Sequence, residues 1–185
     1  MAKLIYVANV SLDGYIEDAQ GRFDWTEPTD EYFVFITDLV RPVGTYLYGR
    51  RLYETMAVWE TEPALADSEL GADFANVWQG ADKIVYSTTR DAAATANTRF
   101  ERHFDPDAVR DIKQSAARDL TVGGATLAAH AFAAGLVDEC HLFVGPVLVG
   151  GGKPAFPRDA RIELELQEER RFDGGVVYLR YRIRS

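Results

Sequence analysis

Cysteine is almost absent from this chain. Its 185 residues include one cysteine, Cys140, and three histidines that share no metal-ligand spacing. A single thiol can form neither an intrachain disulfide framework nor a cysteine-cluster zinc site. The H-x-E…P-C-x-x-C signature of zinc deaminases is missing, and no Ser-His-Asp or Cys-His set can be assembled. We therefore expect no metal, and the low cysteine content suits the reducing cytoplasm, where we expect the protein.

Long apolar runs are missing as well. The N-terminal stretch MAKLIYVANVSLDG has one lysine and a short apolar run, with Asp13 and Glu17 soon after it. It is too short for a signal peptide or a membrane span, so we expect a first strand here. No repeat, low-complexity block or Pro/Ser-rich linker divides the chain. Residues 1–185 are therefore expected to form one domain, which is long enough to bury roughly 70% of its unfolded surface.

Positive charge is scarce. There are 20 Lys and Arg residues against 29 Asp and Glu, which gives a net charge of −9. A chain this acidic is not expected to bind nucleic acid or an anionic membrane surface. A phosphate-bearing ligand would need positive charge gathered locally, so arginines beside glycines are the positions to examine.

Strand-like and helix-like segments alternate along the chain. The pattern predicts strands at residues 3–10, 44–49, 82–88, 98–104, 119–122 and 138–152, and helices at 29–40, 50–59, within 62–80, at 105–116 and at 125–135. Pro28 opens the first helix, and Asp105 and Pro106 begin a later one. Residues 162–185 form a predicted hairpin around the turn at 173–175. This order predicts an α/β fold with a mostly parallel sheet and an antiparallel edge.

Two glycines join a strand to a helix in LTVGGATLAAHAF, residues 120–132. At such a junction small residues let the backbone approach a diphosphate, and the free amides of the helix attract its charge. The alternative is that Gly123 and Gly124 only make a tight turn or allow close packing. The full G-x-G-x-x-G spacing is absent, which disfavours a Rossmann fold.

A second junction, YLYGRRLYET, places Arg50 and Arg51 directly after Gly49. The helix dipole disfavours cations at this end, so two arginines here favour a phosphate partner, although a solvated basic pair is the alternative. A third strand ends in VYSTTR, where hydroxyls and Arg90 are either a phosphate cradle or ordinary turn residues. All three motifs follow strands, at the edge where open α/β sheets bind ligands.

The segment FDWTEPTDEYF supplies acidic candidates in Asp24, Asp30 and Glu31. A carboxylate at the start of a half-apolar helix is expected to be partly buried, with a raised pKa suited to holding a proton. The alternative is that acids stand in a first helical turn because the dipole favours them there.

Six segments in collinear order carry a resemblance to a known family. They are ANVSLDGYI, FDWTEP, RPVGTYLYGRRLYETM, KIVYSTTR, TVGGATL and GLVDECHLFVGPVLVGGGKPAF, within residues 8–156. Together they resemble dihydrofolate reductase-like proteins, in particular stand-alone relatives of the reductase domain of the bacterial riboflavin deaminase–reductase. The resemblance implies an NADPH-dependent oxidoreductase that forms a homodimer, with the apolar strand CHLFVGPVLV contributing to the interface.

The resemblance also implies which residues bind NADPH along the carboxyl edge of the sheet. They are Ala8 and Ile16 at the nicotinamide, Gly49, Arg50, Arg51 and Leu52 at the diphosphate and adenosine phosphate, Ser87, Thr88, Thr89 and Arg90 at the 2′-phosphate, and Gly123, Gly124, Ala125, Thr126 and Leu127 at the diphosphate.

On the substrate side, Trp25-x-x-Pro28-x-Asp30 resembles the W-x-x-P-x-D segment that carries the substrate-binding carboxylate of bacterial dihydrofolate reductases. This favours Asp30, with Glu31 as the second candidate, and places Asn9 and Trp25 beside the substrate. The segment VGPVLVGGGKPAF resembles the riboflavin-type reductase instead, and the arginine that grips the folate tail has no clear counterpart.

The expected activity is hydride transfer from NADPH to a pterin-, pyrimidine- or flavin-like heterocycle, under a loop from Ser11 to Trp25 that closes over the nicotinamide. Two alternatives remain. One is a non-catalytic NADP(H)-binding or regulatory module of the same fold. The other is an interaction protein in which the glycines only pack.

Overall fold

A mixed sheet forms the centre of the protein. The structure is a computed structural model that describes residues 1–25 and 28–184. Within these residues the main sheet has eight strands in the order β5-β4-β3-β6-β1-β7-β10-β9. The strands are Leu4–Ser11 (β1), Val43–Gly49 (β3), Asp82–Tyr86 (β4), Thr98–Glu101 (β5), Asp119–Gly123 (β6), Glu139–Gly145 (β7), Leu164–Arg171 (β9) and Val177–Ile183 (β10).

The strand directions confirm the predicted fold class. The neighbouring strands β5, β4, β3, β6, β1 and β7 run parallel to one another. Strands β10 and β9 are antiparallel and form one edge of the sheet. The hairpin between β9 and β10 turns at Gly174 and Gly175, whose φ angles of +85° and +86° are ones that side chains disfavour.

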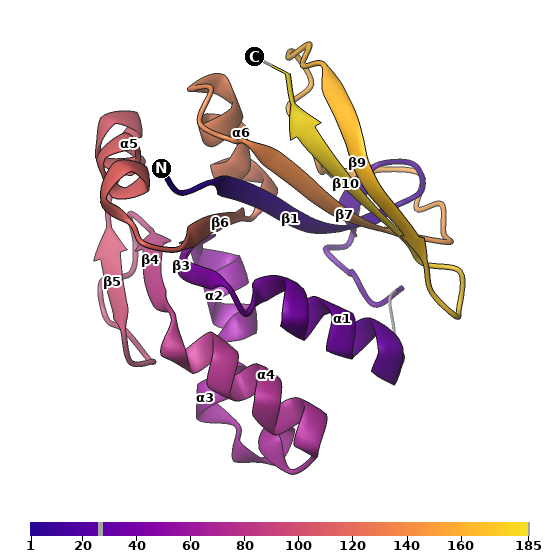
Figure 1. Cartoon of the computed structure of the whole chain (residues 1–185), viewed down its shortest axis with the longest axis horizontal. Coiled ribbons are helices and arrows are strands. Elements are labelled where there is room, and N and C mark those ends of the chain that lie inside the picture. Colours follow the sequence, from indigo (N-terminus) through magenta and orange to yellow (C-terminus); the bar gives the residue numbers. More distant parts are fainter. Residues whose placement is uncertain (26–27, 185) are drawn as a thin grey trace.

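Helices cover both faces of the sheet (Figure 1). On one face lie α1 (Asp30–Val40), α2 (Arg50–Met56), α3 (Val58–Thr61) and α4 (Glu69–Gly80), and on the other lie α5 (Pro106–Ser115) and α6 (Ala125–Ala133). The helices α1, α4 and α5 begin with side-chain caps from Thr29, Ser68 and Asp105, as expected for residues that satisfy free amides. Among residues 1–25 and 28–184, no helix is long and apolar enough to span a membrane.

Alternation along the strands builds a core on each face. In β1, Leu4, Tyr6 and Val10 pack towards α6, whereas Val7 joins the aromatic cluster below α1. On the α1 face, Tyr32 of α1 makes an edge-to-face contact with Phe143, with the ring centroids 5.0 Å apart. Packing of this kind on the two faces of the sheet fixes α1 and the carboxyl ends of β1 and β7 relative to one another.

Three predicted elements differ from the structure. The strand predicted at 138–152 ends at Gly145, because Pro146 has no amide to continue the ladder. The helix predicted at 50–59 is divided at Ala57 into α2 and α3. The predicted loop after β1 contains a short strand, β2 (Tyr15–Asp18), which pairs with β8 (Gly152–Pro154).

The expected interface segment, residues 140–149, begins inside the sheet, and its part in a homodimer stays a prediction. Residues 140–143 of CHLFVGPVLV are buried, and β7 pairs with β1 on one side and β10 on the other. The later part of the segment is more open, with Pro146 exposed and Leu148 70% exposed.

Candidate functional site

A cavity of about 820 Å³ lies at the carboxyl ends of β1, β3 and β6 and extends between the sheet and α1. Its lining comes from segments far apart in sequence, because parallel strands bring their carboxyl ends to one edge. Of the predicted site residues, those that line this cavity are Ala8, Asn9, Ile16, Arg51, Leu52, Gly123 and Gly124.

The two glycines have distinct structural roles. A Cβ atom on Gly123 would overlap Leu52 Cδ2 and would lie 3.4 Å from the Tyr48 ring, so a side chain here would require Leu52 to shift. Gly124 has a φ angle of +90°, which disfavours any side chain. Turn geometry therefore accounts for Gly124 and the contact with Leu52 favours Gly123, and both residues also line the cavity.

Two helix N-termini meet beside Gly124. This residue is the N-cap of α6, Gly49 is the N-cap of α2, and neither makes a side-chain cap hydrogen bond. A Cβ atom on Gly124 would lie 3.8 Å from the Gly49 nitrogen. Because helix N-termini leave amides without intrahelical partners, this corner of the cavity presents hydrogen-bond donors.

The predicted arginines stand around this corner in ion pairs. Arg51 lines the cavity, its side chain is 75% exposed, and its Nη1 lies 3.9 Å from Glu17 Oε1. Glu54 also lines the cavity and pairs through Oε1 with Arg90 at 2.9 Å and Arg50 at 3.3 Å. A phosphate at this position would therefore compete with Glu54 for two cations.

The third motif, VYSTTR, ends in a turn at residues 87–90 that does not line the cavity. The Ser87 hydroxyl oxygen accepts hydrogen bonds from the amides of Arg90 at 3.0 Å and Thr89 at 3.3 Å, which is the turn role given above as the alternative. Thr88 and Thr89 are exposed. The Arg90–Glu54 pair connects this turn to the cavity.

The residues that follow Gly124 are buried in part. Ala125 and Leu127 are buried in the α6 layer, and Thr126 is exposed. None of the three lines the cavity. Their contribution to a ligand would come through the backbone amides of the first turn of α6.

Two of the acidic candidates lie at the start of α1 and Asp24 lies in the loop before it, and the expectation of partial burial is wrong, since all three are exposed. Asp30 and Glu31 are exposed, and neither lines the cavity. Glu31 Oε1 accepts a hydrogen bond from Arg170 of β9 at 2.7 Å. Trp25 is partly buried outside the lining, and the adjacent residues 26–27 lie outside the described part of the chain.

Asn9 is the predicted substrate residue that the cavity does contain. It is exposed at the end of β1, and its Oδ1 accepts a hydrogen bond from the Tyr32 hydroxyl at 2.7 Å. Tyr32 belongs to α1, and its side chain is buried between that helix and the sheet. This contact fixes the Asn9 carbonyl, so its NH₂ group is directed away from Tyr32 and is available as a donor.

Sequence reasoning missed the aromatic inner wall of the cavity. This wall consists of buried residues from α4, β3, β6 and β7, namely Tyr46, Tyr48, Phe74, Trp78, Thr121 and Phe143. The alternation in GTYLYG was an available signal, because it places Tyr46 and Tyr48 on one face of β3. Their rings are stacked, with centroids 5.4 Å apart.

The first residues of the loop between β1 and α1 are held by hydrogen bonds to Asp13. Asp13 accepts hydrogen bonds from the Ser11 hydroxyl at 2.6 Å and the Gly150 amide at 2.8 Å. The bond from Ser11 is the largest cause that lowers the pKa of Asp13, against a smaller opposing effect of burial. Any closing motion would therefore carry β2 and β8 together, or occur beyond them in residues 19–25.

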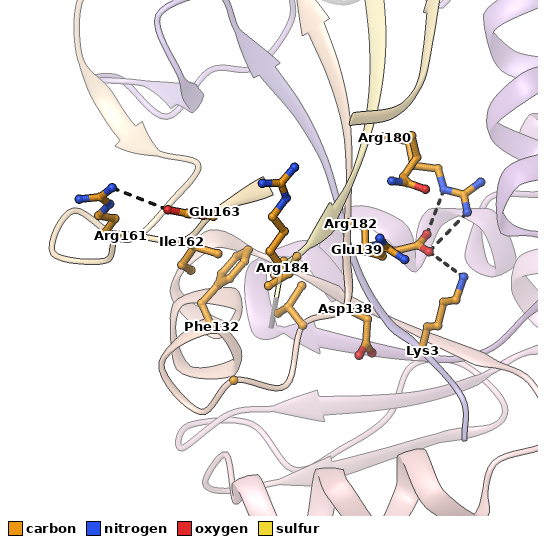
Figure 2. Close-up of a pocket in the computed structure, with 14 residues that line it drawn as sticks. Lys3, Phe132, Asp138, Glu139, Arg161, Ile162, Glu163, Arg180, Arg182 and Arg184 are labelled. Atoms are coloured by element: carbon orange, nitrogen blue, oxygen red, sulfur yellow. Dashed lines mark hydrogen bonds and ion pairs between the residues drawn. The ribbon is translucent and has the colours of Figure 1, made fainter. Parts of the chain in front are cut away.

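A second cavity, of about 970 Å³, lies at the opposite edge of the sheet and contains none of the predicted site residues. Figure 2 shows its charged side chains, with Lys3 and Arg180 both directed at Glu139. Arg161 pairs with Glu163 at 3.7 Å on the far side. Its cations are largely matched by acids, so this cavity has the character of a structural ion network.

Comparison with known proteins identifies the family. The model of the RibD C-terminal domain matches residues 2–178. The protein YyaP of Bacillus subtilis (strain 168) is 30% identical over 182 residues, which cover 97% of this chain and 94% of YyaP. The chain belongs to the RibD C-terminal domain family.

Solved structures show the same fold at lower identity. A Shewanella sp. PV-4 protein that its name assigns to riboflavin biosynthesis is 20% identical with a TM-score of 0.77, over all of both chains. RibD of Acinetobacter baumannii is 15% identical with a TM-score of 0.71. The Thermotoga maritima deaminase/5-amino-6-(5-phosphoribosylamino)uracil reductase is 14% identical with a TM-score of 0.67. This chain covers 59% and 57% of the last two proteins.

Proposed function

We propose that this protein is an NADPH-dependent reductase that transfers hydride to a C=N or C=O bond of a pterin-, pyrimidine- or flavin-like heterocycle. The observation that carries the proposal is the cavity itself. It joins Arg51 and the glycine corner to an aromatic wall within one space of about 820 Å³. Membership of the RibD C-terminal domain family supports a reductase.

The residues present fit the cofactor. Gly124, at a φ of +90°, lines the cavity as the N-cap of α6, and the amides of the first turn of α6 would bind the diphosphate. Arg51 would pair with the diphosphate, and Arg90 with the 2′-phosphate after release from Glu54. When bound, NADPH would supply a hydride from its nicotinamide ring and leave as NADP⁺, while a proton from solvent or a side chain completes the reduction.

The chain's own groups would position the heterocycle. Asn9, held by Tyr32, would donate a hydrogen bond to it, and the aromatic wall would exclude water from its ring. Asp30 stays the proposed acidic residue, with Glu31 as the second candidate, although neither side chain lines the cavity.

A thermal shift titration with NADPH, NADP⁺ and NADH tests the cofactor half of the proposal. A ligand that binds only the folded state adds about 2.7 kcal/mol of stability at a hundredfold excess over its dissociation constant. We expect a large rise in Tm with the two phosphorylated cofactors and a small one with NADH. No rise with any of the three would overturn the proposal. A rise without oxidation of NADPH by any heterocycle would favour the non-catalytic module instead.

A further inference from the structure

The two faces of the β9–β10 hairpin differ in chemistry. On the face towards α1, the charged side chains form ion pairs with one another or with α1. These pairs are Glu165–Arg182 at 2.6 Å, Arg170–Glu31 at 2.7 Å and Glu168–Arg180 at 3.8 Å. Tyr178 and Phe172 are buried beneath them beside Tyr32 of α1. This face is therefore closed by contacts within one chain.

The opposite face of the hairpin is apolar and partly open. Leu164 lies opposite Ile183, and Leu166 lies opposite Tyr181, so these side chains share that face with Leu179. Leu164 is 36% exposed and Leu166 is 47% exposed, and neither belongs to the buried core. Figure 1 shows that α5 and α6, the helices on this side of the sheet, lie away from β9. We call Leu164, Leu166, Leu179, Tyr181 and Ile183 the hairpin face.

Two charged residues stand beside the hairpin face without a partner. Glu169 lies opposite Leu179 and Arg171 lies opposite Val177, so both point to the same side as the hairpin face. Both are exposed. Every other charged residue of β9 and β10 has an ion pair, whereas these two have none among residues 1–25 and 28–184. An acid and a base two residues apart on one strand are self-complementary about a two-fold axis, because Glu169 of each copy can meet Arg171 of the other.

The charge of the hairpin favours a second copy as the partner. The chain has a net charge of −9, so two copies repel each other over most of their surface. Strands β9 and β10 carry four arginines and three glutamates, which makes this surface nearly neutral. Strand β9 is also an edge strand of eight residues, with β10 on one side and no described strand on the other. An exposed edge strand with apolar side chains pairs readily with another chain.

We propose that two copies of this chain form a two-fold dimer through the hairpin face, with Glu169 of each copy paired to Arg171 of the other. None of these residues lines the candidate site, so the inference does not depend on the proposed function. It places the interface on β9 and β10, and not on the exposed end of residues 140–149, where Leu148 lies. Dimerisation would remove Leu164 and Leu166, the most exposed apolar side chains of the hairpin, from water.

Sedimentation equilibrium over protein concentrations from about 1 to 100 µM measures the state of association, against a monomer of 20.6 kDa. We expect the wild-type protein to be a dimer at the upper concentrations. Leu166→Glu, which places two charges in the apolar interface, should raise the dimer dissociation constant at least about a hundredfold. Leu65→Glu, at an exposed leucine outside the hairpin, is the matched control and should leave that constant unchanged.

Two results of this experiment would overturn the inference. One is a wild-type protein that is monomeric throughout the concentration range. The other is a dimer that persists in Leu166→Glu. Disruption of that dimer by Leu148→Glu would then assign the interface to residues 140–149.

A charge exchange tests the ion pair without an apolar change. Glu169→Arg and Arg171→Glu should each weaken the dimer by about three- to thirtyfold, because the two-fold axis repeats each exposed pair. The double variant Glu169→Arg/Arg171→Glu restores both pairs in reversed order and should return to within about threefold of the wild type. Far-UV circular dichroism checks that each variant is folded. If the double variant is weakened by the sum of the two single effects, Glu169 and Arg171 do not pair across the interface, and the inference is overturned.

Discussion

Glu54 Oε1 lies 2.9 Å from Arg90 Nη1, and this ion pair joins the cavity to the turn at 87–90. Both side chains are partly exposed, at 36% and 40%. The same carboxylate also pairs with Arg50. Arg50 and Arg90 are thus already paired with the Glu54 carboxylate, and a cofactor phosphate would have to displace that carboxylate to bind them.

Replacing Glu54 with Gln should therefore tighten NADPH binding. A unit charge about 5 Å away contributes on the order of 1 kcal/mol in water, so removing the carboxylate predicts about a three- to fivefold lower Kd at low salt, shrinking as salt screens it. NADH, which lacks the 2′-phosphate, should change less. Isothermal titration of both cofactors measures this, with Glu163→Gln in the opposite cavity as the control. Weaker NADPH binding would show that Glu54 instead orients the arginines.

Substitutions at Gly123 can distinguish its role in packing against Leu52 from its role in admitting a ligand to the cavity. In Gly123→Ala the new methyl group overlaps Leu52 Cδ2, and we expect a loss of about 1 kcal/mol in unfolding free energy, at the low end for overpacking, because the Leu52 side chain can shift. The double variant Gly123→Ala/Leu52→Ala opens space and should recover part of that loss in urea denaturation. NADPH binding should stay weak in both variants, because the methyl group remains in the cavity wall. Full recovery of NADPH affinity in the double variant would assign Gly123 to packing alone.

Asp30 can be tested without disturbing the cofactor. If it holds the heterocycle, Asp30→Asn should lower kcat/KM by about a hundredfold, within the usual range for a proton-handling group, and leave the NADPH Kd unchanged. Asp38→Asn is the matched control, since Asp38 is an exposed acid on the same helix. Equal turnover by Asp30→Asn would remove Asp30 from the site.

Glu139 should govern acid stability. It accepts from Lys3 at 2.6 Å, His141 at 3.0 Å and Arg180 at 3.1 Å. Burial opposes ionisation, but these hydrogen bonds outweigh it and lower the pKa of Glu139 to about 2 from its usual 4.5. Burial also lowers the pKa of His141 below 6.5, against the pull of Glu139.

Both pKa values are lower in the folded state, so the unfolded chain binds more protons as pH falls. Stability is complete above about pH 6.5 and falls with pH, first through His141 and then below about pH 4.5 through Glu139. Glu139→Gln should cost about 2–3 kcal/mol at pH 7 and flatten the profile below pH 4.5. Urea denaturation from pH 3 to 8 measures this, with exposed Glu163→Gln, which pairs with Arg161 outside the Glu139 network, as the control. Parallel profiles of wild type and Glu139→Gln below pH 4.5 would contradict it.

Much of the fold could be predicted from local pattern. Strand alternation, the Asp105 cap and the glycine turn at 174–175 depend on neighbours in sequence, and these elements are present in the structure. The short pairing of β2 with β8 was missed because it joins residues more than a hundred positions apart. The end of β7 was misjudged because an apolar run continues past Pro146.

For the site, the sequence by itself determined which residue types follow each parallel strand, and parallel strands bring those ends to one edge. Only the tertiary structure decided which of them share a cavity. It placed Arg51, Gly123 and Gly124 in the lining, left Asp30 exposed, paired Arg90 with Glu54, and packed Tyr46 with residues of α1 and α4. The physical reason is that secondary structure follows from local periodicity, whereas burial, ion pairing and a cavity wall depend on side chains that meet only after folding.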